Sequence, residues 1–264
     1  MSKKYLGIIC LIYSTIFGYV VFFDKLTNFL APQMQLYVKL SIIPMLVIGL
    51  ILLFSKKNHY EFKISDLILL LPLIILIIAG DGVLSSDFAS NRAINTNKKY
   101  RIKQAEQYEY DDEYLNAEYD FTNPYFEIID SNYEGLADYI TFAPKAEKFK
   151  GKTIRVRGFI LKKAPYLPKG YFAIGKYSVS CCVADAEFLG FIVKYDINKV
   201  IEGNWYEIEG ILEKGVDAEG YSMMFIKVVN IKEIKAKGEK RYIYPCYNYA
   251  EGSCEAMAKY EMDY

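Results

Sequence analysis

Three long apolar runs fill most of the first 84 positions, and the rest of the chain is polar or alternates apolar and polar residues over short stretches. The runs extend from Tyr5 to Phe23, from Leu36 to Phe54 and from Asp66 to Leu84. Each approaches the roughly 20 apolar residues that an α-helix needs to cross a bilayer. The pattern therefore predicts a membrane domain over 1–84 with three transmembrane helices.

Lysine placement predicts how these helices are oriented. Lys3, Lys4 and the three lysines of loop 55–63 lie on one side, whereas the loop after the first run holds Asp24 and Lys25. By the positive-inside rule the N-terminus is cytoplasmic and residues after about 84 are extracytoplasmic, in a multi-pass protein of the cell membrane. A cleaved signal peptide is the alternative for the first run, but no small-x-small cleavage site follows it.

The segment 85–132 is polar, acidic and rich in tyrosine, which predicts a linker or a surface helix. Between Gln104 and Pro144 there are eleven acidic residues and no lysine or arginine. Such a run is most simply a solvated surface. The alternative is an acidic collar that concentrates cations near a transporter.

From Tyr133 onward the pattern becomes that of a small β domain. "YEGLADYITF" reads as a short helix that ends before Pro144, and strand-like runs separated by turn signals follow it. We predict an OB-like five-stranded barrel over 133–235, with a small β-sandwich as the alternative. The five strand-like runs cover residues 152–160, 171–181, 188–195, 204–212 and 222–234.

Alternation and glycines within the runs support a barrel. Ile154 and Val156 fall on one face of the first run, and Phe159 falls on the other. Gly158 and Gly210 lie inside strands, where glycine often marks the bend or bulge that a small barrel needs.

Charge and histidine content narrow the function. Lysine plus arginine and aspartate plus glutamate both number 32, so the net charge indicates no nucleic-acid partner. A basic strand face is more simply solvated than a binding surface; its residues would be Arg155, Arg157, Lys162 and Lys163. The single histidine, His59, falls in the predicted cytoplasmic loop, which excludes a Ser-His-Asp triad or a histidine zinc site outside. We expect no enzymatic activity.

Two adjacent cysteines, Cys181 and Cys182, are the main candidate chemistry. On a regular strand they would point to opposite faces, and a disulfide between neighbours would be strained because their Cα atoms are only about 3.8 Å apart. One reading makes one of them a core residue. A second ends the strand there, so that both thiolates and Asp185 hold a soft ion such as Zn²⁺ or Cu⁺. A third is a redox-active pair.

The segment 236–264 is a cysteine-containing tail. Cys246 and Cys254 would close a short disulfide loop outside the cell, or supply further ligands to the Cys181 and Cys182 site. Cys10 lies in the first apolar run and is most simply an apolar residue there.

The stretch "SVSCCVADAEFLGFIV" and the strands around it, "GKTIRVRGFI", "GNWYEIEGIL" and "FIKVVNIKEI", carry a family resemblance. They resemble the YcgQ-type membrane proteins, described as subunits of a two-component permease, whose C-terminal domain of unknown function has a Cys-Cys-x-Ala-Asp-Ala motif. The motif residues here are Cys181, Cys182, Ala184, Asp185 and Ala186. The resemblance implies a separate polytopic permease subunit as the partner.

These observations favour a non-enzymatic accessory subunit, embedded in the lipid bilayer, whose outer β domain binds or gates a transported solute, with a metal ion as one candidate. The alternative is a membrane-anchored thiol, redox or metal-binding protein that acts without a permease. A third reading is an anchored OB-type module for peptidoglycan fragments or nucleic acid. Its stacking faces would be Tyr171, Phe172, Tyr177 and Trp205.

Overall fold

A computed structural model of the chain describes residues 4–55, 71–72, 122–129, 133, 136–137, 140, 146–163, 167–216, 222–235 and 242–244. The chain divides into two compact units. The first comprises residues 1–83 together with 181–185, and the second comprises 84–180 and 186–264. The cysteine motif therefore belongs to the unit that contains the apolar helices.

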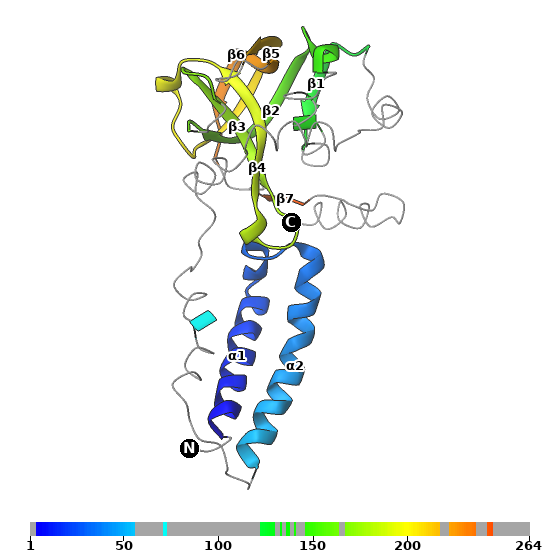
Figure 1. The fold of residues 1–264 in the computed structure, drawn as a ribbon, viewed down its shortest axis with the longest axis vertical. Coiled ribbons are helices and arrows are strands. Elements are labelled where there is room, and N and C mark those ends of the chain that lie inside the picture. The colour runs from blue at the N-terminus through cyan, green and yellow to red at the C-terminus, as the bar shows by residue number, and fades with distance from the viewer. Residues whose placement is uncertain are drawn as a thin grey trace. The chain divides into compact units, whose positions relative to one another are not determined.

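Two helices of the first unit are long and apolar enough to cross a membrane (Figure 1). They are α1, Lys4–Phe22, and α2, Pro32–Phe54, joined through the 3-10 turn η1, Lys25–Asn28. Of the third predicted span only Leu71 and Pro72 are described, and both are helical. The rest of that span lies outside the described residues.

Small and hydroxyl side chains allow α1 and α2 to pack closely. A Cβ atom built on Gly7 would lie 2.9 Å from the carbonyl oxygen of Gly49, so only glycine fits without a shift. Ser14 donates a hydrogen bond through Oγ to the carbonyl oxygen of Ile42, at 3.2 Å. Close backbone approach and interhelical hydrogen bonds of this kind hold helices together in lipid. The two helices thus form a packed hairpin.

The second unit is built on one sheet with the order β1-β2-β5-β6-β4-β3-β7, and β2 also pairs with β3. That extra pairing closes β2, β5, β6, β4 and β3 into a five-stranded barrel (Figure 1). The pairing of β4 with β6 is parallel, and the remaining barrel pairings are antiparallel. The prediction of an OB-like barrel, rather than a sandwich, is confirmed. The strands are β1 Tyr125–Ile128, β2 Thr153–Leu161, β3 Tyr171–Ser178, β4 Glu187–Lys194, β5 Trp205–Val216, β6 Ser222–Glu233 and β7 Tyr242–Ile243.

Two of the strands, β1 and β7, were not predicted. The first pairs in parallel with β2 and lies in the segment predicted as a linker or helix, so the sheet begins upstream of residue 133. The second pairs in parallel with β3 and lies in the segment predicted as a tail. Both are edge strands of four and two residues, too short to show an alternating pattern.

Glycines permit the barrel to close. A Cβ on Gly158 of β2 would lie 2.6 Å from the carbonyl oxygen of Gly175 on β3, at the place where these two strands pair. The register of β5 against β6 shifts between Glu209 and Gly210, which is the bulge predicted at that glycine.

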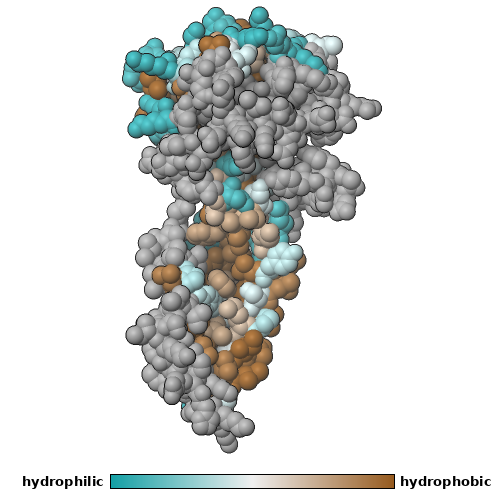
Figure 2. All heavy atoms as spheres, in the orientation of Figure 1, coloured by the Kyte–Doolittle hydropathy of each residue, from teal (hydrophilic) through white to brown (hydrophobic). Residues whose placement is uncertain are grey.

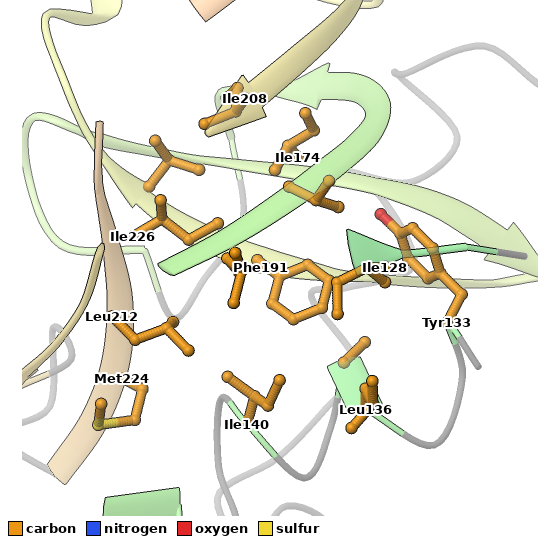
Figure 3. Packing of buried hydrophobic residues seen from close by; sticks show 14 of the residues in the cluster. Ile128, Tyr133, Leu136, Ile140, Ile174, Phe191, Ile208, Leu212, Met224 and Ile226 are labelled. Carbon is orange, nitrogen blue, oxygen red and sulfur yellow. The ribbon is translucent and has the colours of Figure 1, made fainter. Parts of the chain in front are cut away.

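Apolar side chains fill the barrel interior (Figure 3). Ile154 and Val156 of β2 are fully buried there, as their alternation predicted. The predicted short helix closes this core, because its described residues are helical and fully buried at the spacing i, i+3, i+4, i+7. Those residues are Tyr133, Leu136, Ala137 and Ile140. The ring of Tyr133 packs edge-on against Phe191 of β4, with 5.8 Å between centroids.

A second apolar cluster covers the other face of β2 and β3. Phe159, predicted to face away from Ile154, is fully buried in it, with ring centroids 5.1 Å from Tyr177 and 6.0 Å from Trp205. Tyr242 of β7 packs against this cluster. The outward face of the sheet is therefore apolar near the end of β3 that leads into the cysteine motif.

Candidate metal centre

The cysteine pair lies just beyond the end of a strand. The strand β3 ends at Ser178, and residues Val183–Asp185 form the 3-10 turn η5 before β4 begins at Glu187. The predicted strand 171–181 is therefore three residues too long, and neither cysteine takes part in the ladder between β3 and β4. Because the chain turns here, the two side chains are not obliged to point to opposite faces.

The two sulfur atoms lie on the same side of the turn. Sγ of Cys181 is 3.8 Å from Sγ of Cys182, and both thiols are free. A carboxylate oxygen of Asp185 lies near both sulfurs, and the three candidate ligand atoms are all within 4.8 Å of one another. All three residues are half-buried. Among the residues that the structure describes, this is the one such group of cysteine, histidine or acidic side chains.

Asp185 also fixes the backbone of the turn. Its Oδ2 atom accepts hydrogen bonds from the backbone N–H groups of Cys181, at 2.7 Å, and Cys182, at 3.3 Å. Its own N–H donates to the carbonyl oxygen of Cys182, at 2.9 Å. Local bonds of this type are common where aspartate follows a turn. The carboxylate is thus held close to both sulfurs by the backbone that carries them.

The same carboxylate changes the acidity of the first thiol. Its hydrogen bond with Cys181 raises the pKa of that thiol to about 12, and the hydrogen bond with Cys182 and partial burial act in the same direction. The main physical reason is that the protonated thiol can donate a hydrogen bond to the carboxylate and the thiolate cannot; the negative charge of Asp185 adds a smaller effect in the same direction. Without an ion, Cys181 is therefore a protonated thiol at neutral pH.

Backbone hydrogen bonds attach the motif to the turn between α1 and α2. The N–H of Ala31 donates to the carbonyl oxygen of Cys181, and the N–H of Val183 donates to the carbonyl oxygen of Phe29, both at 3.0 Å. Between them, Leu30 and Cys182 form an antiparallel β-bridge. Sequence reasoning missed this contact because backbone pairing across about 150 residues leaves no side-chain pattern to recognise.

The two alanines of the motif differ in their surroundings. Ala184 is exposed, whereas Ala186 is fully buried in the apolar cluster that contains Phe159 and Tyr177. The small side chain at 186 lets the chain re-enter the sheet against these rings.

The other sequence candidates do not join the site. Cys10 is a free, half-buried residue of α1. His59, Cys246 and Cys254 lie outside the described residues. Whether the last two close a disulfide or add ligands stays a prediction.

The structure pairs the two arginines of the basic strand face with glutamates and buries most of the rings considered for stacking. Arg155 pairs with Glu209 at 3.4 Å, and Arg157 pairs with Glu207 at 2.6 Å, across β2 and β5. The rings considered for stacking are mostly internal, since Phe172, Tyr177 and Trp205 are at most 3% exposed. These three side chains offer no open face to a nucleic-acid base.

The fold and the site define a class: a β-barrel protein with apolar helices of membrane-spanning length and a turn that carries two thiols and a carboxylate. The sequence profile of the DUF1980 C-terminal domain matches residues 100–245, which include the motif, and the chain belongs to this family. That membership is consistent with the resemblance to YcgQ-type proteins. No curated protein and no solved structure matches the chain.

Proposed function

We propose that the protein is a membrane-anchored, non-enzymatic accessory subunit that holds a thiophilic metal ion at Cys181, Cys182 and Asp185 and presents it to a polytopic permease. Zn²⁺ is the preferred ion and Cu⁺ is the alternative. The observation that carries the proposal is the separation of the two sulfurs.

Sulfur spacing favours a tetrahedral ion. Two thiolates bound to one Zn²⁺ at about 2.3 Å, with a tetrahedral angle of about 109°, lie about 3.8 Å apart. The sulfurs of Cys181 and Cys182 are 3.8 Å apart. A linear two-coordinate ion with bonds of similar length would need about 4.6 Å, so the pair would have to open to bind Cu⁺ in that geometry.

Three protein ligands leave a fourth coordination position. Sites that keep one position open bind water or an exchangeable group there, whereas structural zinc sites are closed by four protein ligands. An open position at a half-buried turn suits an ion that is taken up and passed on. Cys246 or Cys254 would close the site if one of them supplied a fourth ligand.

We infer a partner because the three predicted spans, α1, α2 and the apolar run 66–84, are too few to enclose a solute pathway. A polytopic permease would provide it, as the family resemblance implies. A photo-crosslinker at Leu40, which is 60% exposed on α2, should capture such a protein in the membrane. The same crosslinker at Ser14, which is buried against α2, should not.

Metal retention tests the ion site directly. The full chain, purified in detergent under reducing conditions, stripped of metal and then incubated with Zn²⁺, should retain about one equivalent of the ion after desalting. The variants Cys181→Ser and Cys182→Ser should lose it, whereas Cys10→Ser, which removes a thiol in α1, should retain it. Zinc content near zero in the unmodified chain would remove the basis of the proposal.

The alternative, a thiol redox protein, has less support from the acidity of the Cys181 thiol. Redox-active and catalytic cysteines usually have a lowered pKa, because the thiolate is the nucleophile. The pKa of Cys181 is instead raised by the Asp185 carboxylate. The redox alternative would gain support if the chain cycled reversibly between the thiol and disulfide forms of this pair while retaining no zinc.

A further inference from the structure

Exposed aromatic side chains gather at the end of the helical hairpin where α1 meets its turn. Tyr19, Phe22 and Phe23 are 52%, 81% and 54% exposed. Their rings are in contact, with centroids 4.5 Å apart for Tyr19 and Phe23 and 5.2 Å apart for Phe22 and Phe23. The ammonium of Lys25 lies 5.8 Å from the centre of the Tyr19 ring. We call these four residues the aromatic patch.

The composition of the aromatic patch fits the boundary between lipid and water. Tyrosine and other aromatic residues collect at the headgroup level of membrane proteins, and lysine extends its charge toward water there. Along their length, α1 and α2 present mainly hydrophobic residues on the face shown in Figure 2. On α2 the first exposed large apolar side chains are Met34 and Leu36, two and four residues after Pro32. Both helices thus reach the same boundary near the turn.

The cysteine motif is joined to this same turn. The bonds from Ala31 to Cys181 and from Val183 to Phe29 place the two backbones side by side. Opposed residues of an antiparallel bridge are about 5 Å apart between Cα atoms, so Cys182 lies that close to Leu30. Leu30 and Ala31 immediately precede the first residue of α2. The two cysteines therefore lie close to the start of α2.

We propose that Cys181, Cys182 and Asp185 form a membrane-surface site, held in the lipid headgroup layer by the aromatic patch and by the turn at Phe29–Ala31. The ion named in the proposed function would then be bound among headgroups rather than in bulk solvent. Only the identity of the ion depends on the proposed function. The location of the site can be measured without any metal.

A location among headgroups has a consequence for uptake. Anionic lipids give a membrane surface a potential of about −30 mV, which raises the concentration of a divalent cation there about tenfold. A site in this layer samples the raised concentration. The apparent affinity for Zn²⁺ should therefore be about tenfold higher in vesicles rich in phosphatidylglycerol than in vesicles of phosphatidylcholine, and high salt should remove the difference.

Depth-dependent quenching of tryptophan fluorescence tests the location. The full chain is reconstituted into phosphatidylcholine vesicles that contain either a nitroxide on the headgroup or bromine deep in the acyl chain. A tryptophan is placed at Ala184, the exposed residue of the motif, and the emission of the native Trp205 is measured in the unmodified chain and subtracted. Phe22→Trp marks the aromatic patch, and Leu46→Trp, midway along α2, marks the hydrocarbon core.

The expected result is that Ala184→Trp is quenched by the headgroup nitroxide as strongly as Phe22→Trp, and less by deep bromine than Leu46→Trp. Thr27→Trp, in the turn η1, should behave like Ala184→Trp and serves as the second variant if the first fails to fold. The location would be overturned if the headgroup nitroxide quenched neither Ala184→Trp nor Thr27→Trp, or if both were quenched by deep bromine as strongly as Leu46→Trp. Quenching at the headgroup level in a chain that retains no zinc would keep the location and remove the ion.

Discussion

The Oδ2 atom of Asp185 lies 2.7 Å from the backbone nitrogen of Cys181 and accepts its hydrogen bond. One carboxylate therefore both shapes the turn that brings the two sulfurs together and stands within reach as a ligand. Either role alone would make Asp185 important, and substitutions can separate them.

Asp185→Asn keeps an oxygen acceptor for the two backbone N–H groups and removes the charge. We expect this variant to fold with nearly unchanged stability but to bind Zn²⁺ at least ~10-fold more weakly. Asp185→Ala removes the acceptor as well, and should in addition lose about 1–2 kcal/mol of unfolding free energy, because two partly buried donors lose their partner. Isothermal titration and thermal unfolding of the full chain measure the two effects.

The matched control for this pair is Asp196→Asn. Asp196 accepts a hydrogen bond from the N–H of Asn198 at 3.0 Å and caps the 3-10 turn η6, Ile197–Lys199. Asp196→Asn removes the same charge and keeps the same kind of acceptor. Because Asp196 is not one of the candidate ligands, zinc binding should be unchanged. If Asp185→Asn binds zinc as tightly as the unmodified chain, the carboxylate serves the backbone alone.

Slow alkylation of Cys181 is a second expected result. The pKa of its thiol is raised to about 12, chiefly by the hydrogen bond with Asp185, so the thiolate is scarce below that pH. A higher pKa also makes the remaining thiolate more nucleophilic, which offsets part of the effect. At pH 8 iodoacetamide should modify Cys181 roughly 10- to 100-fold more slowly than an ordinary cysteine. Its rate should rise with pH well above pH 9.

Peptide mass spectrometry of the metal-free chain follows this reaction residue by residue. Asp185→Asn replaces the charged acceptor of the thiol hydrogen bond with a neutral, weaker one and removes the negative charge, so Cys181 should react faster in this variant. Equal rates in the two proteins would show that Asp185 does not control the thiol.

Parts of this structure follow from the sequence because they depend on local patterns. The alternation of Ile154 and Val156 gives the barrel face, and Gly210 marks a bulge because a Cβ there would meet Ile226 at 2.4 Å. The end of β3 could not be predicted as accurately from the sequence. The run of β-type residues continues to Cys181, but the N–H of that residue donates to Asp185, which takes it out of the ladder.

Long-range backbone pairing is what the sequence could not reveal. The residue types at Cys181, Cys182 and Asp185 mark a candidate metal site in the sequence, but the bridge from Cys182 to Leu30 involves main-chain atoms only. No side-chain type is selected by such a bridge. The attachment of the site to the helical hairpin therefore required the structure.

The two alanines of the motif should respond differently to enlargement. Ala186 is fully buried beside Phe159 and Tyr177, so Ala186→Leu should overpack this cluster and lower the unfolding free energy by about 1–3 kcal/mol. Ala184 is exposed, and Ala184→Leu should change stability by less than about 0.5 kcal/mol. Chemical denaturation of both variants in the same detergent gives the comparison. Equal losses would mean that position 186 is not packed in this way.

The turn between α1 and α2 constrains the membrane topology of the rest of the chain. If α1 and α2 span the bilayer, Ser55 at the end of α2 lies on the N-terminal side, whereas Ala31 lies on the opposite side. The backbone N–H of Ala31 donates a hydrogen bond to the carbonyl oxygen of Cys181, at 3.0 Å, so Cys181 lies on the same side as Ala31. The chain must therefore cross the membrane an odd number of times between residues 55 and 181. The apolar run 66–84 is long enough for that crossing. With the lysines of 3–4 and 55–63 inside, a reporter that works only in the cytoplasm should be active after Ser55 and silent after Tyr264. Activity at both positions would mean an even number of spans, which is incompatible with the bond between Ala31 and Cys181 in a membrane-spanning hairpin.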